Sequence, residues 1–291
     1  MKILVLGANG QLGLCLKDQF RDTNIVVRYA SRQEIDISNF FDTEKAILKI
    51  APDIIINASG YTAVDQAEKE SEYANLINHL AVSNLAKICL KMNLWLIHLS
   101  TDYVFDGKST QPYQESSLPF PLSIYGQTKF MGETSIQSTA CKYFIIRTAW
   151  VYSEYGKNFL KSILSFAKER NTINVVNDQI GCPTYAQDIA RVIFFLVRKI
   201  LNKDQLDSSL LHYSGDIACS WYDFAKLIIY EANDLGFNKS VEVIPISTAS
   251  LSQAAHRPPY SVLDCSKITK DFGITSSDVL AGIRNALRAL L

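Results

Sequence analysis

The chain has 291 residues, of which 48% are hydrophobic and 20% are charged. This composition is typical of a globular protein with a real core, and the length suits one large domain or two modest ones. Lysine plus arginine balance aspartate plus glutamate at 29 each, so no basic excess indicates a nucleic-acid or membrane partner. No apolar run approaches the ~20 residues that a membrane-spanning helix needs.

The first residues enter a strand-like run directly, without the layout of a signal peptide. The six cysteines and four histidines are scattered along the chain, and no two cysteines form a Cys-x-x-Cys pair. This pattern favours a reducing, cytoplasmic location and predicts no metal site.

Residues 2–6 form a short apolar run that predicts a buried parallel strand. The strand leads into Gly7-Ala8-Asn9-Gly10-Gln11-Leu12-Gly13, and residues 14–20 then have helical apolar spacing. A strand, a glycine-rich turn and a helix start bring a pyrophosphate to the N–H groups of a helix N-terminus. The spacing is G-x-x-G-x-x-G rather than the common G-x-G-x-x-G. A dinucleotide is therefore expected here, and a tight turn without a ligand is the alternative.

A second strand is predicted at residues 25–29, and Ala30-Ser31-Arg32 follows where the common fingerprint has an acidic residue. Arg32 can instead hold the 2′-phosphate of NADPH, because a guanidinium matches the geometry of phosphate. The alternative is an exposed loop arginine with no ligand. Asp36-Ile37 follows at the head of a further predicted helix.

The next strand, residues 53–57, ends in Ala58-Ser59-Gly60-Tyr61-Thr62, whose small residues suit close approach to a cofactor. Residues 63–92 have a helical pattern with Asn78 among apolar neighbours. An ordinary half-buried side chain is expected at Asn78, and a side chain that orients a backbone group or a water is the alternative. The strand after it, residues 95–100, runs into Thr101 and Asp102. Ligands of open α/β sheets bind at the carboxyl ends of strands, so the Thr101 hydroxyl can bond a substrate carbonyl oxygen. A turn or helix cap is the alternative.

Tyr125 and Lys129 stand four residues apart in a predicted helix and so project from the same face. A free phenol titrates near ~10, and a neighbouring ammonium lowers that pKa. General acid–base catalysis works best when the pKa lies near the operating pH. We therefore expect Tyr125 to be a catalytic acid tuned by Lys129, although a chain with 14 tyrosines also contains such pairs by chance.

A further strand is predicted at residues 143–147, and Thr148-Ala149-Trp150 follows it. The alternation of strands and helices up to residue 152 predicts an α/β fold with a doubly wound parallel sheet. We expect residues 1–152 to form an NAD(P)-binding Rossmann domain, with later segments near 173–200 returning to it. Residues 153–291 are expected to form mainly a substrate domain. In this half the pattern predicts helices at 158–169, 186–200, 221–235 and 278–290, and strands at 173–176, 210–214 and 241–245.

Taken in order, Gly-x-x-Gly-x-x-Gly, Ser-Thr-Asp and Tyr-x-x-x-Lys resemble the motifs of the extended short-chain dehydrogenases/reductases. The likeness covers nearly the whole chain. Its segments are GANGQLG (7–13), PDIIINASGYTAVDQAE (52–68), LIHLSTDYVFDG (96–107), YGQTKFMGE (125–133), RTAWVY (147–152), NDQIGCPT (177–184) and RPPYSVLD (257–264). Two departures stand out: Gly60 replaces the usual alanine, and residues 277–279 replace a Pro-x-Trp before the last helix.

The resemblance implies a modified Rossmann domain with a smaller sugar-nucleotide domain. It implies NAD(P)H-dependent reduction of the 4-keto group of dTDP-4-dehydro-L-rhamnose to dTDP-L-rhamnose, with Thr101, Tyr125 and Lys129 as catalytic residues. Thr101, Asp102 and Trp150 fall on the sugar contacts. Together with the glycine turn and Arg32, the residues expected to bind the cofactor are Gly7, Gly10, Gln11, Leu12, Gly13, Arg32, Asp36, Ile37, Gly60, Tyr61, Thr62, Tyr125 and Lys129.

Two alternatives remain open at this stage. One is an enzyme of the same fold that reduces or epimerises another nucleotide sugar. The other is a binding protein without catalysis, similar to the regulatory subunit of methionine adenosyltransferase. The sequence does not indicate the oligomeric state, and a homodimer is the first assembly to test. It also does not indicate whether the protein binds a divalent ion such as Mg²⁺, which some relatives use.

Overall fold

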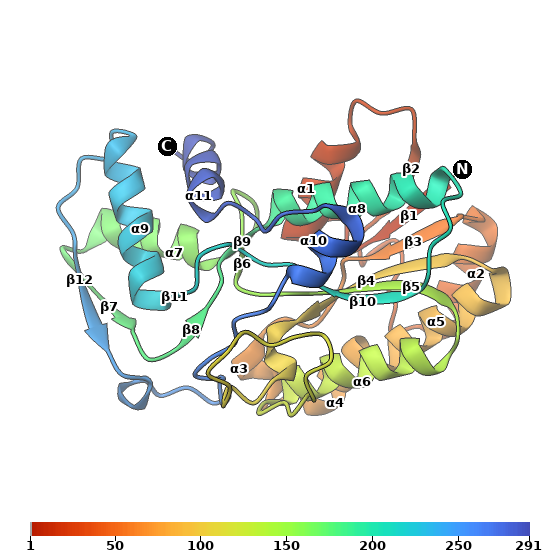
Figure 1. Cartoon of the computed structure of the whole chain (residues 1–291), viewed down its shortest axis with the longest axis horizontal. Helices are drawn as coiled ribbons and strands as arrows, with labels where there is room; N and C mark the ends of the chain where they lie inside the picture. Colours follow the sequence, from red (N-terminus) through yellow and green to blue (C-terminus); the bar gives the residue numbers. More distant parts are fainter. Residues whose placement is uncertain (1) are drawn as a thin grey trace.

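The computed structural model describes residues 2–291. Its centre is a six-stranded parallel sheet with the order β10-β5-β4-β3-β1-β2 (Figure 1). The chain leaves β1 toward β2 on one side and returns to β3 on the other, so the connections reverse between β1 and β3, which is where open α/β sheets bind ligands. The strands are β1 (Lys2–Leu6), β2 (Val26–Ala30), β3 (Ile54–Asn57), β4 (Trp95–Thr101), β5 (Lys142–Thr148) and β10 (Ser209–His212).

Both faces of the sheet are buried, as continuous apolar strands require. In β1, Ile3 and Val5 point to one face, whereas Leu4 and Leu6 point to the other. Helices α1 (Gln11–Phe20) and α8 (Ala186–Leu201) cover the first face (Figure 1). The second face is covered by α2 (Phe40–Ile50), α5 (Ala81–Met92) and α6 (Ile124–Ser138).

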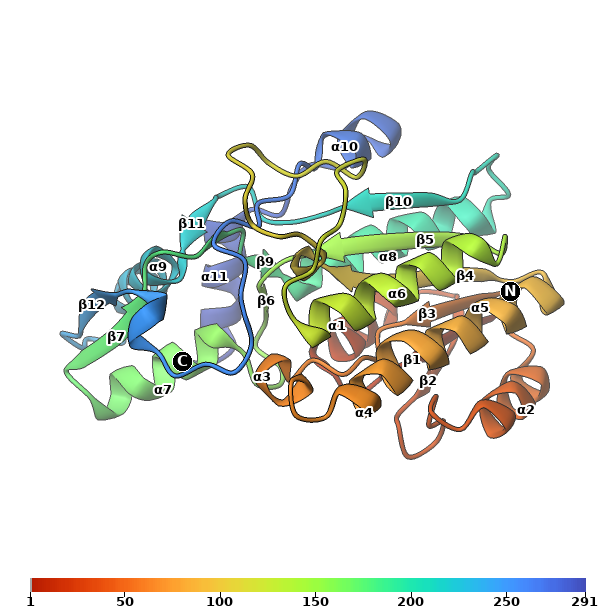
Figure 2. The same ribbon diagram turned by 90° about the horizontal axis from the view of Figure 1, so that it is seen from below.

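A smaller unit, here called the small lobe, has its own apolar core beyond one end of the sheet. Figure 2 shows the arrowheads of β5 and β10 pointing toward it. Its helices are α7 (Phe159–Glu169), α9 (Trp221–Asp234) and α11 (Val279–Arg288), and its parallel strands are β7 (Thr172–Val176) and β12 (Glu242–Ile246). Two short strand pairs join the parts: β6 (Val151–Tyr152) with β9 (Thr184–Tyr185), and β8 (Ile180–Gly181) with β11 (Cys219–Ser220).

Several elements differ from the expectation. The helix predicted at 63–92 is broken into α3 (Val64–Ala67), α4 (Ser71–Asn75), a π-helical turn η1 (Leu76–Leu80) and α5. The helix predicted to start at Asp36 begins at Phe40, because the Asn39 side chain caps it by accepting from the Asp42 N–H.

The segment near 173–200, expected to return to the first domain, does so only in part. Its strand β7 pairs with β12 outside the main sheet, whereas α8 packs on the main sheet and the later strand β10 joins it. Short pieces that the apolar pattern did not predict are α10 (Ser266–Phe272) and the 3₁₀ turns η2 (Asp102–Val104) and η3 (Thr248–Ser250).

Across residues 2–291, every helix is too short or too polar to cross a bilayer. All six cysteines lie within these residues as buried free thiols.

Candidate active site

A cavity of about 690 Å³ opens where the carboxyl ends of the main sheet meet the small lobe. Every residue expected to bind cofactor or substrate lines it, except Gly13. Asn9, Ala58 and Ser59, from the two segments expected near the cofactor, also line it. Residues that line it without having been expected there are Ile35, Val64, Tyr73, Ile77, Leu99, Ser100, Tyr103, Thr148, Val151, Lys157, Asn158, Ile189 and Trp221.

The glycine turn leaves backbone N–H groups open toward this cavity. Gly7 has φ of +81°, and a Cβ there would lie 2.7 Å from the Ser59 nitrogen. A Cβ on Gly13 would overlap the Gly7 carbonyl oxygen, so Gly13 allows α1 to pack closely on the turn after β1 and does not line the cavity. Gly10 is the N-cap of α1 and offers no side chain to its first N–H groups, so these remain available to an anion.

Arg32 lies at the rim of the cavity, with its side chain 68% exposed. Its Nε is 3.4 Å from Asp36 Oδ2, and the guanidinium lies 5.6 Å from the centre of the Tyr73 ring. Partial burial raises the pKa of Asp36, but hydrogen bonds from Ser38 and the charge of Arg32 outweigh it and leave a lowered pKa. Arg32 is thus a loosely held cation that can reach an anionic group.

Asn78 was expected to be an ordinary half-buried residue, but it is buried and joins two parts of the site. Its Oδ1 accepts from the Tyr61 N–H at 2.8 Å, while its Nδ2 donates to the Tyr61 carbonyl at 3.0 Å and to Thr128 Oγ1 at 3.3 Å. A Cβ on Gly60 would lie 3.3 Å from Asn78 Oδ1. The π-helical turn that carries Asn78 is a feature often found at functional sites. The available signal was a polar residue on the apolar face of a helical pattern.

Tyr125 occupies the first turn of α6, which Ser123 caps by accepting from the Gly126 N–H at 3.2 Å. A Cβ on Gly126 would overlap the Tyr103 carbonyl oxygen, so glycine allows α6 to approach the turn after β4. Tyr125 packs edge-on against Tyr103 at 5.8 Å between ring centres. Burial raises the pKa of Tyr125 to about 12, partly offset by hydrogen bonding from Thr101.

Lys129 does not have the position expected of it. Its Nζ donates to the Leu99 carbonyl at 2.5 Å and lies 3.3 Å from His98 Nε2, so β4 holds the ammonium. Burial lowers the pKa of Lys129 to about 8, against the opposing charge of Glu133. The prediction that Lys129 lowers the pKa of Tyr125 is therefore wrong in this structure, because burial dominates at the phenol.

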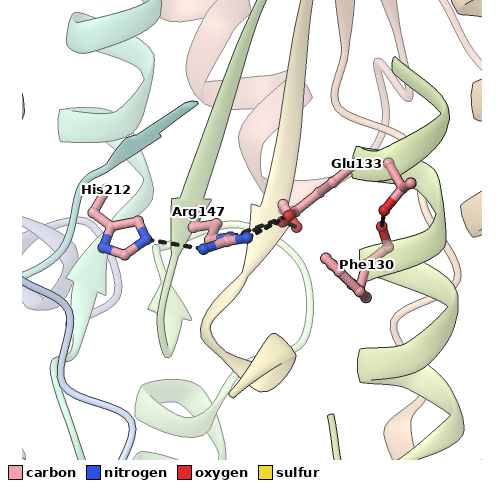
Figure 3. A network of polar contacts seen from close by, with 6 residues as sticks. Phe130, Glu133, Arg147 and His212 are labelled. Atoms are coloured by element: carbon pink, nitrogen blue, oxygen red, sulfur yellow. Dashed lines mark hydrogen bonds and ion pairs between the residues drawn. The ribbon is translucent and has the colours of Figure 1, made fainter. Parts of the chain in front are cut away.

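A buried ion pair joins Glu133, one turn after Lys129 in α6, to Arg147 of β5 (Figure 3). The Arg147 guanidinium donates to both carboxylate oxygens of Glu133, with Nη2 to Oε2 at 2.6 Å, and both side chains are almost fully buried. Arg147 Nη1 lies 3.4 Å from His212 Nε2, and Ser100 Oγ donates to Glu133. The pair thus joins the helix of Tyr125 to β4, β5 and β10, and removing one partner would leave an uncompensated buried charge.

Trp150 lines the cavity, packs against the core of the small lobe and also packs against a small apolar cluster around Phe105. It has φ of +45°, which is uncommon for a residue other than glycine. Its indole stacks on that of Trp221, and a Cβ on Gly181 would lie 2.5 Å from its Cε2. Contact with a sugar and packing between the two parts are therefore compatible roles for Trp150. Trp221 had no motif to single it out, because it begins an ordinary amphipathic helix.

Thr101 ends β4 and is buried. Its Oγ1 accepts from the Tyr103 N–H at 3.2 Å and bonds Asp102 Oδ1 at 3.0 Å. Metal-ligand clusters of three or more His, Cys, Asp or Glu side chains do not occur among residues 2–291. Hydroxyl, phenol and ammonium groups thus converge on a site whose other end offers helix N–H groups.

Comparison with known proteins places this geometry in context. Residues 1–291 match the family described as the RmlD substrate binding domain. A dTDP-4-dehydrorhamnose reductase of Aggregatibacter actinomycetemcomitans is 39% identical over 286 residues, which is 98% of this chain and 97% of that protein. The crystal structure of a dTDP-4-dehydrorhamnose reductase from Clostridium acetobutylicum superposes with a TM-score of 0.92 at 34% identity, covering 100% of this chain and 99% of that one. That of Bacillus anthracis, in complex with NADP, gives a TM-score of 0.92 at 35% identity over 99% of this chain and 98% of that one.

Proposed function

Since the chain belongs to the family of the RmlD substrate binding domain, we propose that it uses NADPH to reduce the 4-keto group of dTDP-4-dehydro-L-rhamnose to dTDP-L-rhamnose. The observation that carries this is the convergence of Thr101, Tyr125 and Lys129 on the cavity that also receives the uncapped N-terminus of α1. The relatives reported above have this activity in their names and span the full length of the chain.

The cofactor fits the residues present. A side chain at Gly7 would clash with the backbone of the loop after β3, so glycine lets the turn lie against that loop, and the N–H groups that follow Gly10 have no side-chain cap. These groups would hold the pyrophosphate. Arg32 would bind the 2′-phosphate, and Lys129 would bond the nicotinamide ribose. When bound, NADPH supplies the hydride.

Thr101 and Tyr125 would face the substrate carbonyl oxygen, where negative charge develops as the carbon is reduced. Because the pKa of Tyr125 is raised, its phenol is fully protonated at neutral pH and can donate. The alkoxide that forms is a stronger base than a phenolate, so proton transfer from Tyr125 is favourable.

We propose that the main sheet and its helices hold the cofactor, while the small lobe, with Trp150 and Trp221, holds the nucleotide sugar. The boundary expected at residue 152 separates these roles only in part, because α8, from the segment near 173–200 expected to return, and β10 pack with the main sheet.

Turnover with defined nucleotide sugars tests the proposal. The protein is mixed with NADPH and dTDP-4-dehydro-L-rhamnose; NADPH absorbance should fall, and mass spectrometry should find a product two mass units heavier than the substrate, as addition of two hydrogens requires. A panel of other 4-keto nucleotide sugars is run beside it. Turnover confined to another sugar would replace the substrate. Binding of NADPH and sugar without turnover of any of them would favour a regulatory subunit instead.

A further inference from the structure

Asp102 is a buried carboxyl group, 2% exposed, that joins the Thr101 hydroxyl to the segment crossing from the small lobe. Its Oδ1 lies 3.0 Å from Thr101 Oγ1, and its Oδ2 accepts from Ser261 Oγ at 2.5 Å. Ser261 is itself fixed by its N–H, which donates to the Ile180 carbonyl at 2.8 Å. Each carboxyl oxygen of Asp102 therefore has one defined side-chain partner, and backbone N–H groups of Asp102 and Tyr103 also contact the carboxyl group.

The hydrogen positions around Thr101 decide what this hydroxyl can do. A threonine hydroxyl has one hydrogen to donate and two lone pairs to accept with, and an ionised carboxylate can only accept. One lone pair of Thr101 is taken by the Tyr103 N–H. If Asp102 is ionised, the Thr101 hydrogen must point at Asp102, and nothing is left to donate into the cavity.

If Asp102 is a neutral carboxylic acid, the hydrogen bond between Asp102 Oδ1 and Thr101 Oγ1 can run in the opposite direction. The Asp102 hydroxyl then donates to the second lone pair of Thr101, and Oδ2 goes on accepting from Ser261. Thr101 then accepts twice, and its hydrogen is released from Asp102 and can turn toward the cavity, where the Tyr125 oxygen also lies within its hydrogen-bonding reach. We propose that Asp102 works in its neutral form as a positioning residue, turning the Thr101 hydrogen toward the substrate carbonyl oxygen. This inference rests on the proposed function, because it assumes a carbonyl oxygen at that point.

The surroundings of Asp102 favour the neutral form near neutrality. Burial raises its pKa to about 7, although the hydrogen bonds from Ser261 and Thr101 act in the opposite direction. The titratable and charged groups that face it are Tyr103 in the same turn, Tyr125 from α6, Cys182 after β8 and, beyond Tyr103, Arg257. Burial also raises the pKa of both tyrosines and of the Cys182 thiol, and the pKa of Arg257 is raised, so none of the four changes charge near pH 7.

Lys129 is the other cavity residue with a pKa near this range, lowered to about 8. The two groups predict separate losses of activity as pH rises. Asp102 ionises first, and the Thr101 hydroxyl then donates to Asp102 instead of to the substrate. Losing one such hydrogen-bond donor lowers kcat by ~10²–10³. Lys129 then loses its charge.

Three variants separate the contributions in a series of kcat measurements from about pH 5 to about pH 9. Asp102→Asn keeps a neutral side chain that donates to Thr101 and accepts from Ser261, so the loss near pH 7 should disappear while the loss due to Lys129 remains. Ser261→Ala removes a donor that stabilises the ionised form, so the same loss should move to higher pH. Thr101→Val should lower kcat by ~10²–10³ at low pH and remove the step due to Asp102.

An unchanged loss near pH 7 in both Asp102→Asn and Ser261→Ala, with melting temperatures near that of the parent protein, would overturn the inference. A second measurement needs no turnover. Difference infrared spectra of the parent protein against Asp102→Asn should contain the carbonyl band of a protonated carboxyl group below pH 7, and Ser261→Ala should retain it to higher pH. Absence of this band at low pH would refute the inference even if the enzyme reduces the sugar. Its presence without turnover of any sugar would refute the proposed function alone.

Discussion

Trp150 and Trp221 stack face to face, with ring centres 3.5 Å apart and planes inclined by 4°. The pair lies at the boundary between the small lobe and the cavity, and both residues line that cavity. One face of the Trp150 indole is thus covered by protein, so a sugar ring can reach only its other face or its edge. This differs from a tryptophan that offers an open platform to the substrate.

Trp150→Phe should therefore affect binding and stability together. We expect KM for the nucleotide sugar to rise ~10-fold, as loss of a well-fitting apolar contact does. The free energy of unfolding should fall by about 0.5–1.5 kcal/mol through the lost stacking. NADPH affinity should stay within a few-fold. Trp95→Phe is the control: Trp95 stacks on Phe144 at 5.1 Å at the start of β4, away from the cavity, so its loss should lower stability without raising KM. An unchanged KM with a lowered melting temperature would remove Trp150 from the sugar site.

Tyr125→Phe should remove the proton donor while keeping the ring. We expect kcat to fall by ~10²–10⁴, the range for loss of a general acid, with NADPH affinity little changed. Steady-state kinetics and fluorescence titration with NADPH measure the two effects. Tyr143→Phe, at the start of β5 and far from the cavity, is the matched control. A kcat near that of the parent protein would show that another group delivers the proton.

Arg32→Ala should weaken NADPH binding far more than NADH binding, since only NADPH carries the 2′-phosphate. A hydrogen bond to a charged group contributes about 1.5–3 kcal/mol, which corresponds to ~10- to 100-fold in Kd. Arg28→Ala is the control, because Arg28 is also exposed on this side but pairs with Glu34 and lies outside the cavity lining. If both cofactors lose affinity equally, Arg32 does not touch the phosphate and use of both cofactors is the better interpretation.

Asn78→Asp should separate the role of the Asn78 amide from the size of its side chain. A carboxylate can still accept from the Tyr61 N–H but cannot donate to the Tyr61 carbonyl or to Thr128. Losing buried partners in this way costs ~1–3 kcal/mol, so urea unfolding should show that loss and NADPH should bind more weakly. Asn84→Ala, one turn into α5 where the side chain makes a single 3.4 Å contact, should stay within ~0.5 kcal/mol. Equal stability of Asn78→Asp and the parent protein would mean that water replaces the lost partners.

The buried His212 beside Arg147 should make the protein sensitive to acid. Burial and the Arg147 charge lower its pKa to about 3, whereas an unfolded histidine titrates near ~6.5. Below ~6.5 the unfolded chain therefore binds a proton that the folded chain does not, and the stability falls as pH drops toward 3. His212→Gln should reduce the slope of unfolding free energy against pH by ~1.4 kcal/mol per unit between about pH 6 and pH 4. Unfolding of this variant is compared with that of His256→Gln, an exposed histidine. Identical slopes in all three proteins would contradict the lowered pKa.

The sequence alone determined the elements whose signal is local. The four apolar residues between Lys2 and Gly7 predicted β1, because a strand buried on both faces needs an uninterrupted apolar run. The glycine turn predicted the start of α1, since close backbone approach leaves no room for a Cβ at Gly7 or Gly13. The four-residue spacing of Tyr125 and Lys129 likewise predicted that both would reach one cavity.

Only the tertiary structure decided which groups meet across elements and how much water they lose. The partner of the Lys129 ammonium is the Leu99 carbonyl of β4, and the partner of Asp102 is Ser261, far away in the chain. Spacing within one helix indicates which face a side chain occupies, but contains nothing about the strand beneath that face. The pKa of Tyr125 is raised chiefly by burial, with a smaller contribution from the Asp102 charge, and burial exists only once distant segments have packed around the phenol.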